Sequence, residues 1–221
     1  MRKCSKRIEA LLSMIPPQVG ALADIGADHG YFVCEAVSRN KVQSALAVEN
    51  KEGPYRRLCQ EVQNQHLASK IEVLLSDGIS SLPPHIPFVT IAGMGGETIL
   101  EILKQHSEKL KNVTYLLIDA HSRLPEVRHV ITHLGYQIQQ EVIIYEDEIY
   151  YELILFQKGE AIYLEEDERF GPLLKKEKSP IFIQKWREQL HKWEKILDEK
   201  KLDTKRQEEI KEEMERIRKI L

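Results

Sequence analysis

Short apolar runs alternate with segments of helical spacing through the first 134 residues, and no other feature constrains the fold as strongly. The apolar runs are expected to be strands, and the segments between them repeat apolar residues every three or four positions, as helices do. The expected strands cover 21–25, 44–49, 71–75, 88–92 and 114–118, and the expected helices cover 5–15, 31–38, 53–66, 97–110 and 124–134. This order predicts an α/β fold, with helices on both faces of a mostly parallel, twisted sheet.

Two later strands and a helical segment are expected to complete the chain. The strands, 137–145 and 150–157, are separated by an acidic turn and predict a terminal hairpin. Beyond residue 160 apolar residues recur at spacings of four, three and four, which indicates a heptad seam. They are Trp186, Leu190, Trp193 and Leu197 in one set and Ile210, Met214, Ile217 and Leu221 in the other.

The two heptad sets predict an antiparallel coiled-coil helical hairpin over 184–221. Its turn is expected at 200–203, with Asp203 or Thr204 capping the second helix. We therefore expect two domains, 1–160 and 161–221. The heptads can close within one chain or between two, so the expected state is a monomer or a weak dimer.

Charge is distributed unevenly between these two parts. The whole chain has 32 Lys and Arg against 35 Asp and Glu, a balance that by itself argues against a nucleic-acid partner. Residues 169–221, however, hold 16 basic and 11 acidic residues, a net charge of +5, which leaves −8 on residues 1–168. An acidic body with a basic tail is compatible with phosphate contacts by the tail, although Lys and Glu pairs on a solvated helix face would give the same composition.

Cysteine and histidine usage excludes several other classes. The three cysteines are odd in number and have no C-x-x-C spacing, which argues against a disulfide framework or a zinc site. The histidines are scattered without ligand spacing, so no metal is expected. No apolar run approaches the 18 residues of a membrane span. A soluble, cytoplasmic protein is expected.

The candidate site lies where the strands end, because parallel sheets bind ligands at the carboxyl ends of their strands. After the first strand, Asp24 precedes Gly26, Asp28, His29 and Gly30. A nicotinamide-binding loop would have glycine in place of Asp28, and two carboxylates would repel a pyrophosphate. They suit a ligand with cationic groups, such as S-adenosylmethionine, which carries an ammonium and a sulfonium.

The next two strand ends also carry acceptors suited to a nucleoside. Glu49, followed by Asn50, can accept hydrogen bonds from ribose hydroxyls, and Asp77, followed by Gly78, can accept from an adenine amino group. After the fourth strand, Gly93-Met94-Gly95-Gly96 lets a second planar group approach the backbone, which predicts a substrate slot beside the methyl donor. Asp119 ends the fifth strand and is a candidate to act beside this slot.

At these residues the sequence resembles a known family, the bacterial tRNA (adenine-N1)-methyltransferases that act at position 22 of tRNA. The resemblance is carried by Ser5-Lys6-Arg7-Ile8, residues 22–29, Asp77-Gly78, residues 91–96, Gly135-Tyr136 and residues 151–154. It implies a Rossmann-like class I methyltransferase fold, S-adenosylmethionine as methyl donor, tRNA as partner and a C-terminal coiled-coil pair. The family usually has Gln-Pro where this chain has Asp119-Ala120, and Ala-Tyr-Leu-Pro where it has residues 30–33.

Within this resemblance the candidate residues take distinct roles. The slot Gly93–Gly96 and Asp119 are assigned to methyl transfer, and Tyr31 is a candidate to stack on the target base. Basic residues of the tail are assigned to tRNA phosphates: Lys175, Lys176, Lys185, Arg187 and Lys192. Two alternatives stay open, a methyltransferase of a small molecule or protein, and a non-catalytic RNA-binding protein with a vestigial cofactor fold.

Overall fold

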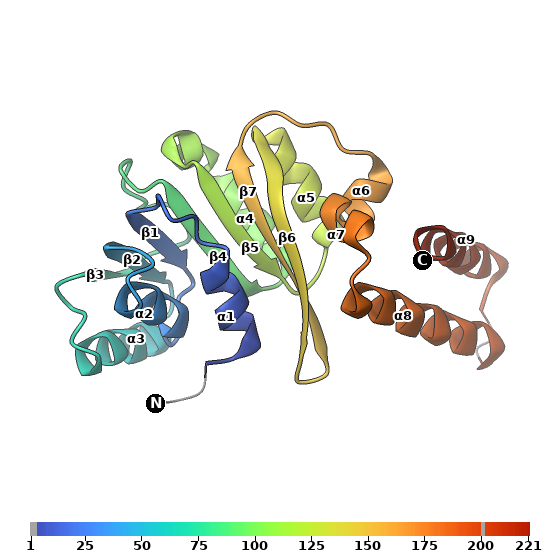
Figure 1. Cartoon of the computed structure of the whole chain (residues 1–221), viewed down its shortest axis with the longest axis horizontal. Coiled ribbons are helices and arrows are strands. Elements are labelled where there is room, and N and C mark those ends of the chain that lie inside the picture. The colour runs from blue at the N-terminus through green and yellow to red at the C-terminus, as the bar shows by residue number, and fades with distance from the viewer. Residues whose placement is uncertain (1–3, 200–201) are drawn as a thin grey trace.

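The computed structural model describes residues 4–199 and 202–221, and its centre is one seven-stranded sheet with the order β3-β2-β1-β4-β5-β7-β6 (Figure 1). The pairs among β1 to β5 are parallel, whereas β7 pairs antiparallel with both β5 and β6. The strands are β1 (Ala21–Ile25), β2 (Ser44–Glu49), β3 (Ile71–Leu75), β4 (Phe88–Met94), β5 (Tyr115–Ala120), β6 (Tyr136–Glu146) and β7 (Ile149–Lys158). The predicted α/β architecture is confirmed.

Helices cover both faces of this sheet. One apolar cluster joins Leu11, Val33 and Leu58 to the side of the sheet under α1, α2 and α3, and a second joins Ile99 and Val127 to the side under α4 and α5. The helices of the body are α1 (Lys6–Ser13), α2 (Tyr31–Ser38), α3 (Glu52–Asn64), α4 (Gly96–Gln105) and α5 (Leu124–His133). Because the central strands are buried on both sides, they read in sequence as continuous apolar runs.

One predicted helix, 97–110, is wrong in extent. The chain leaves the helical conformation at His106, and a short 3-10 helix, η1 (Ser107–Asn112), follows α4. Leu103 is the last buried residue of α4, and Leu110 reaches the same core from η1. The two residues are seven positions apart and would also share one face of a continuous helix, so their spacing predicted a single helix through both.

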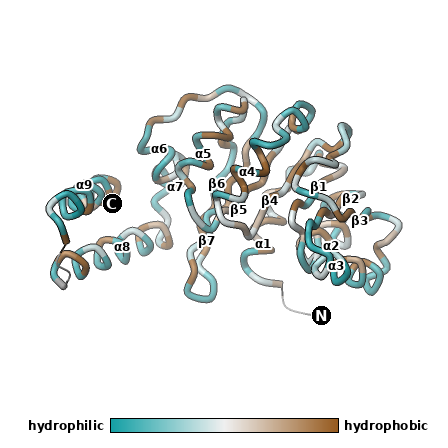
Figure 2. The backbone as a smooth tube through the Cα atoms, turned by 180° about the vertical axis from the view of Figure 1, so that it is seen from behind, coloured by the Kyte–Doolittle hydropathy of each residue, from teal (hydrophilic) through white to brown (hydrophobic). Residues whose placement is uncertain are grey.

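The tail consists of four helices, α6 (Glu165–Phe170), α7 (Pro172–Glu177), α8 (Pro180–Glu199) and α9 (Thr204–Ile220). Apolar and hydrophilic residues alternate along α8 and α9 (Figure 2). The end of α9 returns to the start of α8, since Ile217 and Ile220 pack in one cluster with Phe182 and Trp186. Coiled-coil geometry for this pair stays a prediction.

The predicted turn and cap of the tail have different outcomes. Lys200 and Lys201, which belong to the predicted turn, lie outside the described residues. The cap is confirmed as Asp203, whose side chain accepts a hydrogen bond from the Arg206 amide at 2.8 Å. Across the ranges 4–199 and 202–221, no helix combines the length and apolarity that a membrane crossing requires.

Candidate active site

A cavity of about 520 Å³ lies at the carboxyl ends of β1, β2, β3 and β4. Most of the strand-end residues selected from the sequence line it: Gly26, Asp28, Glu49, Asn50, Asp77, Gly78, Gly93, Met94 and Gly95. The apolar part of the lining includes Ile25, Val48 and Ile102. The structure thus brings these successive strand ends together around one cavity, and their roles as a site stay a prediction.

One wall of the cavity was missed in the sequence. Thr98, Glu101, Ile102 and Gln105 line it from α4, and Lys51 lines it from the loop after β2. The α4 residues recur at three, four and seven positions from Thr98, so they share one helix face. That spacing was available in the sequence, but it pointed to a helix rather than to a site.

Glu49 connects the loops that form the floor of the cavity. Its Oε1 accepts hydrogen bonds from the amides of Asn50 and Lys51, both at 3.0 Å, and its Oε2 accepts from the Asp28 amide at 3.2 Å. The Asn50 side-chain amide in turn donates to Asp77 Oδ1 at 3.3 Å. The protein's own hydrogen bonds thus hold the three strand-end loops in register.

Asp24 lies below this floor and is fully enclosed. Burial raises its pKa to about 7, an effect that the nearby Arg7 guanidinium opposes and the Glu49 carboxylate reinforces. Asp24 itself does not line the cavity, and neither do His29, Gly30 or Gly96. Gly30 serves packing instead, because a Cβ there would lie 2.5 Å from Leu58 Cδ1.

The last two residues of β4, which the sequence placed in the loop after the strand, make two close approaches. Gly93 has φ +79°, which glycine adopts readily, and an added Cβ would lie 2.6 Å from Arg7 Nη2. The Met94 side chain lies over Gly26, where an added Cβ would meet its Cε at 1.9 Å. Arg7 and Met94 therefore occupy the space that side chains at Gly93 and Gly26 would fill.

Asp119 lies beside the carboxyl end of β4 but does not line the cavity. Its side chain is fully buried, and Oδ2 accepts a hydrogen bond from Arg7 Nε at 2.5 Å. The Arg7 guanidinium also lies over the Tyr151 ring, 5.2 Å from the centroid. Arg7 belongs to this region although the sequence analysis gave it no role, because 112 positions separate it from Asp119.

The remaining candidates lie at the rim of the site and on the tail. His29 and Tyr31 stack with ring centroids 5.4 Å apart at the start of α2. In the tail, Lys175 pairs with Asp167 at 2.6 Å and Lys185 pairs with Glu152. Arg187, Lys192 and Lys176 are exposed. No group of three or more His, Cys, Asp or Glu suited to a metal occurs in the part of the chain that the structure describes.

The cavity fits a nucleoside that carries a cationic chain. Glu49 and Asp77 offer acceptors toward one end, Asp28 adds a carboxylate and Asp24 lies beneath. Apolar side chains from β1, β2 and α4 provide the faces against which a base can pack. The fold and this site define a Rossmann-like class I methyltransferase, the class that uses S-adenosylmethionine.

Comparisons with known proteins identify the family within this class. The family model described as tRNA (adenine(22)-N(1))-methyltransferase matches residues 22–219. The Bacillus subtilis tRNA (adenine(22)-N(1))-methyltransferase is 32% identical over 204 residues, which cover 89% of this chain and 85% of that protein. The chain therefore belongs to the tRNA (adenine(22)-N(1))-methyltransferase family, as the sequence resemblance predicted.

Solved structures agree with this assignment over nearly the whole chain. Streptococcus pneumoniae Sp1610, a putative tRNA (m1A22) methyltransferase in complex with S-adenosyl-L-methionine, has a TM-score of 0.91 and 33% identity, covering 99% of this chain and 100% of that one. M. capricolum TrmK in complex with S-adenosyl-homocysteine has a TM-score of 0.87 and 29% identity, covering 98% and 96%.

Proposed function

We propose that this protein transfers a methyl group from S-adenosylmethionine to N1 of the adenine at position 22 of tRNA. The observation that carries the proposal is the family match over residues 22–219, which includes both the acidic cavity and the basic tail. A small-molecule methyltransferase would share the cavity but would have no use for the tail.

The residues that would hold the cofactor follow from the lining of the cavity. We assign Glu49 to the ribose hydroxyls, Asp77 to the adenine amino group and Asp28 to the ammonium group. Asp24, which does not line the cavity, would act on the ammonium group by its charge from beneath the floor, and His29 and the glycines 26, 30 and 78 would shape the loops. When bound, the cofactor supplies an electrophilic methyl group on a sulfonium.

Methyl transfer to adenine N1 needs positioning more than proton removal, because N1 carries a lone pair and no proton. We assign this positioning to the slot Gly93–Gly96, with Asp119 as a carboxylate beside it. The product ring is cationic, so a nearby negative charge stabilises it. N1 is hidden in a Watson–Crick pair, and the base must therefore be unpaired or extruded, which gives Tyr31 a surface on which to stack it.

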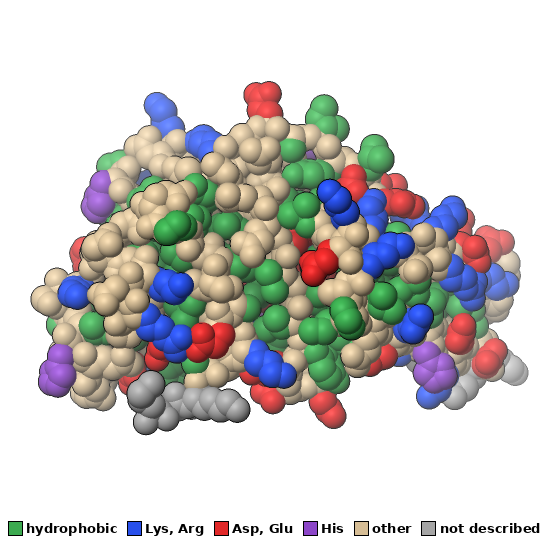
Figure 3. All heavy atoms as spheres, in the orientation of Figure 1, with side chains coloured by type: hydrophobic (Ala, Val, Ile, Leu, Met, Phe, Trp, Pro, Cys, Tyr) green, Lys and Arg blue, Asp and Glu red, His purple; other side chains and the backbone are tan. Residues whose placement is uncertain are grey.

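We further propose a functional division at residue 160. Residues 1–160 would hold the cofactor and residues 161–221 would contact tRNA phosphates, with Lys176, Arg187 and Lys192 as the exposed candidates. Lys and Arg side chains gather over the tail in the space-filling view, interspersed with acidic ones (Figure 3). We expect a monomer or weak dimer that works in the cytoplasm, where tRNA is its substrate.

The test is direct. The protein is incubated with labelled S-adenosylmethionine and a bacterial tRNA transcript carrying A22, and the digest is examined for N1-methyladenosine. A transcript with G22 is the matched control and should remain unlabelled. Equal labelling of both transcripts, or none of either with cofactor binding intact, would contradict the proposal.

The slot has its own test. Met94→Ala is expected to lower turnover at saturating S-adenosylmethionine at least tenfold, a larger factor than the loss of S-adenosylhomocysteine affinity that calorimetry measures. The reason is that Met94 lies over Gly26, at the junction of the cofactor loop and the slot. Undiminished methylation by this variant would remove the slot from the proposal.

A further inference from the structure

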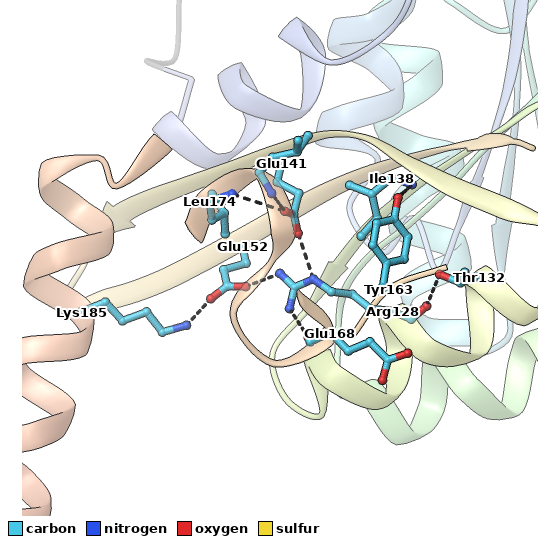
Figure 4. Close-up of polar contacts among 10 residues, drawn as sticks. Arg128, Thr132, Ile138, Glu141, Glu152, Tyr163, Glu168, Leu174 and Lys185 are labelled. Atoms are coloured by element: carbon cyan, nitrogen blue, oxygen red, sulfur yellow. Dashed lines mark hydrogen bonds and ion pairs between the residues drawn. The ribbon is translucent and has the colours of Figure 1, made fainter. Parts of the chain in front are cut away.

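A buried ionic network joins the tail to the sheet (Figure 4). At its centre is Arg128 of α5, whose side chain is fully buried. The Arg128 guanidinium donates from Nε to Glu141 Oε1 at 2.9 Å, from Nη2 to Glu152 Oε2 at 2.6 Å, and from Nη1 to the Glu168 carbonyl oxygen at 3.0 Å. One side chain thus connects α5, β6, β7 and α6.

In each carboxylate of the network, one oxygen accepts a hydrogen bond from Arg128 of the body and the other accepts from the tail. Glu141 Oε2 accepts hydrogen bonds from the Leu173 and Leu174 amides at the start of α7, at 2.9 and 3.4 Å. Glu152 Oε1 accepts from Lys185 Nζ on α8. The tail therefore completes the partners of two buried carboxylates that belong to the sheet.

With Lys185 the network has two cationic side chains, Arg128 and Lys185, for its two carboxylates. Burial alone would raise the pKa of Glu152, but the Lys185 and Arg128 charges lower it to about 2. Glu141, which has Arg128 as its cation, instead has a raised pKa because burial outweighs that charge. Glu152 contacts a second cation, Lys185, that Glu141 lacks, and the Lys185 and Arg128 charges together favour the ionised form of Glu152.

The path of the chain over the network is also fixed. At Gly171, between α6 and α7, φ is +79°, and an added Cβ would lie 2.7 and 2.8 Å from the Glu141 oxygens and 2.9 Å from Arg128 Nη2. A side chain at this position would displace the buried charges. The tail consequently enters α7 and α8 along one route, with little room for an alternative.

The contact between Glu152 and Lys185 lies on the same side of the sheet as the cavity, where the parallel strands have their carboxyl ends. Leu153 of β7 pairs with Asp119, the residue before the last of β5, so Glu152 lies level with the carboxyl end of β5. The Lys185 contact therefore fixes the first turns of α8 beside the carboxyl edge. Arg187 and Lys192 follow on the same helix and are exposed.

We propose that Lys185 is a positioning residue, whose ion pair with Glu152 sets the placement of the exposed basic residues of α8 relative to the methyl-transfer site, and that it is not itself a phosphate contact. The proposal rests on the proposed contact between tail and tRNA. Lys185, which the sequence assigned to tRNA phosphates, would instead hold Arg187 and Lys192 of the same helix in place for those contacts.

The experiment uses the full chain with Lys185→Met, Glu152→Gln and the double variant, and Lys192→Met as the exposed control on the same helix. Lys185→Met and Glu152→Gln should each lower kcat/KM for tRNA about tenfold, because misplaced substrate contacts act on the transition state. The double variant should be no worse than either single one. Calorimetric affinity for S-adenosylhomocysteine should stay at the wild-type value, and Lys185→Arg should restore kcat/KM.

Two readouts separate positioning from contact. Hydrogen exchange in the first turns of α8 should quicken in Lys185→Met and Glu152→Gln but not in Lys192→Met. The dependence of log affinity on log salt should lose about one unit of slope in Lys192→Met, as expected when one phosphate contact is removed.

The opposite pattern would overturn the proposal. If Glu152→Gln keeps wild-type kinetics and exchange while Lys185→Met loses one unit of salt slope, Lys185 is a phosphate contact. Failure of the proposed tail contact would look different, because Lys192→Met and Arg187→Met would then both keep the wild-type tRNA affinity and salt slope.

Discussion

At the scale of single residues, Asp24 is a carboxyl group whose surroundings oppose its charge. It lies near the end of β1 with its side chain enclosed, and burial raises its pKa by more than the Arg7 charge lowers it. The neighbouring Glu49 carboxylate adds a smaller repulsion. A cationic group of a bound ligand would relieve this opposition. Binding of such a ligand is therefore expected to favour the ionised form of Asp24.

The ligand-free protein should show this cost as a dependence of stability on pH. Because the folded pKa of about 7 exceeds the ordinary 3.8, the stability contributed by neutral Asp24 is complete below pH 3.8 and is lost as the pH rises to about 7. Asp24→Asn cannot ionise. Between pH 4 and 8 the wild type should therefore lose on the order of 4 kcal/mol relative to Asp24→Asn in urea unfolding. Parallel stability profiles for the two proteins would contradict the raised pKa.

At the scale of elements, the sequence predicted what depends on local pattern and missed what depends on tertiary contact. Each central strand was recognisable because burial on both faces makes its residues continuously apolar. The six-residue helix α7 was too short to show a period. The break at His106 left no mark in the apolar spacing, because Leu103 and Leu110 would also share one face of a continuous helix. The rule that ligands bind at the carboxyl ends of parallel strands identified the cavity loops. It could not identify Arg7, which reaches Asp119 only because α1 packs against the body.

Gly96 shows why the loop after β4 needs more than one glycine. It starts α4 and accepts no extra atom, since an added Cβ would lie 2.2 Å from the Ser122 carbonyl oxygen. The Gly96 amide also donates a hydrogen bond to the Ser122 hydroxyl oxygen at 3.1 Å. The loops after β4 and β5 therefore approach each other at backbone distance.

Gly96→Ala should lower the free energy of unfolding by about 1–3 kcal/mol, because a methyl group forced against backbone must shift one of the two loops. Gly53→Ala is the matched control. It lies in the first turn of α3, where the nearest atom to an added Cβ is Arg57 Nη1 at 3.8 Å, and it should be neutral or stabilising by up to about 1 kcal/mol. Chemical denaturation followed by circular dichroism measures both, and equal stability of Gly96→Ala and wild type would refute the packing argument.

At the scale of the whole molecule, the acidic body and the basic tail share buried charges. The sequence suggested a separable appendage, because the change of pattern near residue 160 is abrupt. In the structure Arg128, Glu141 and Glu152 of the body are completed by groups from α6, α7 and α8. An apolar cluster that includes Ile143 of β6 and Trp186 of α8 lies beside them. The body and the tail thus form one continuous structure.

This continuity predicts a single cooperative unfolding transition, and the chain contains its own reporter. Both tryptophans, Trp186 and Trp193, lie on α8, so tryptophan fluorescence follows the tail while far-UV circular dichroism follows the whole chain. The two signals should coincide during urea unfolding of the wild type. Arg128→Met leaves two carboxylates buried with Lys185 as their remaining cation, which should cost about 3–5 kcal/mol and move the fluorescence transition to lower urea than the circular dichroism transition.

Arg216→Met is the matched control for this experiment. Arg216 of α9 also links two tail helices through an ion pair, with Glu165, but both side chains are exposed. Its loss should cost less than about 1 kcal/mol and leave the two signals coincident, because water screens an exposed pair and solvates the partner that remains. Separate fluorescence and circular dichroism transitions in the wild type would show that body and tail unfold independently, and the buried network would then lose its role as the connection between the two functions.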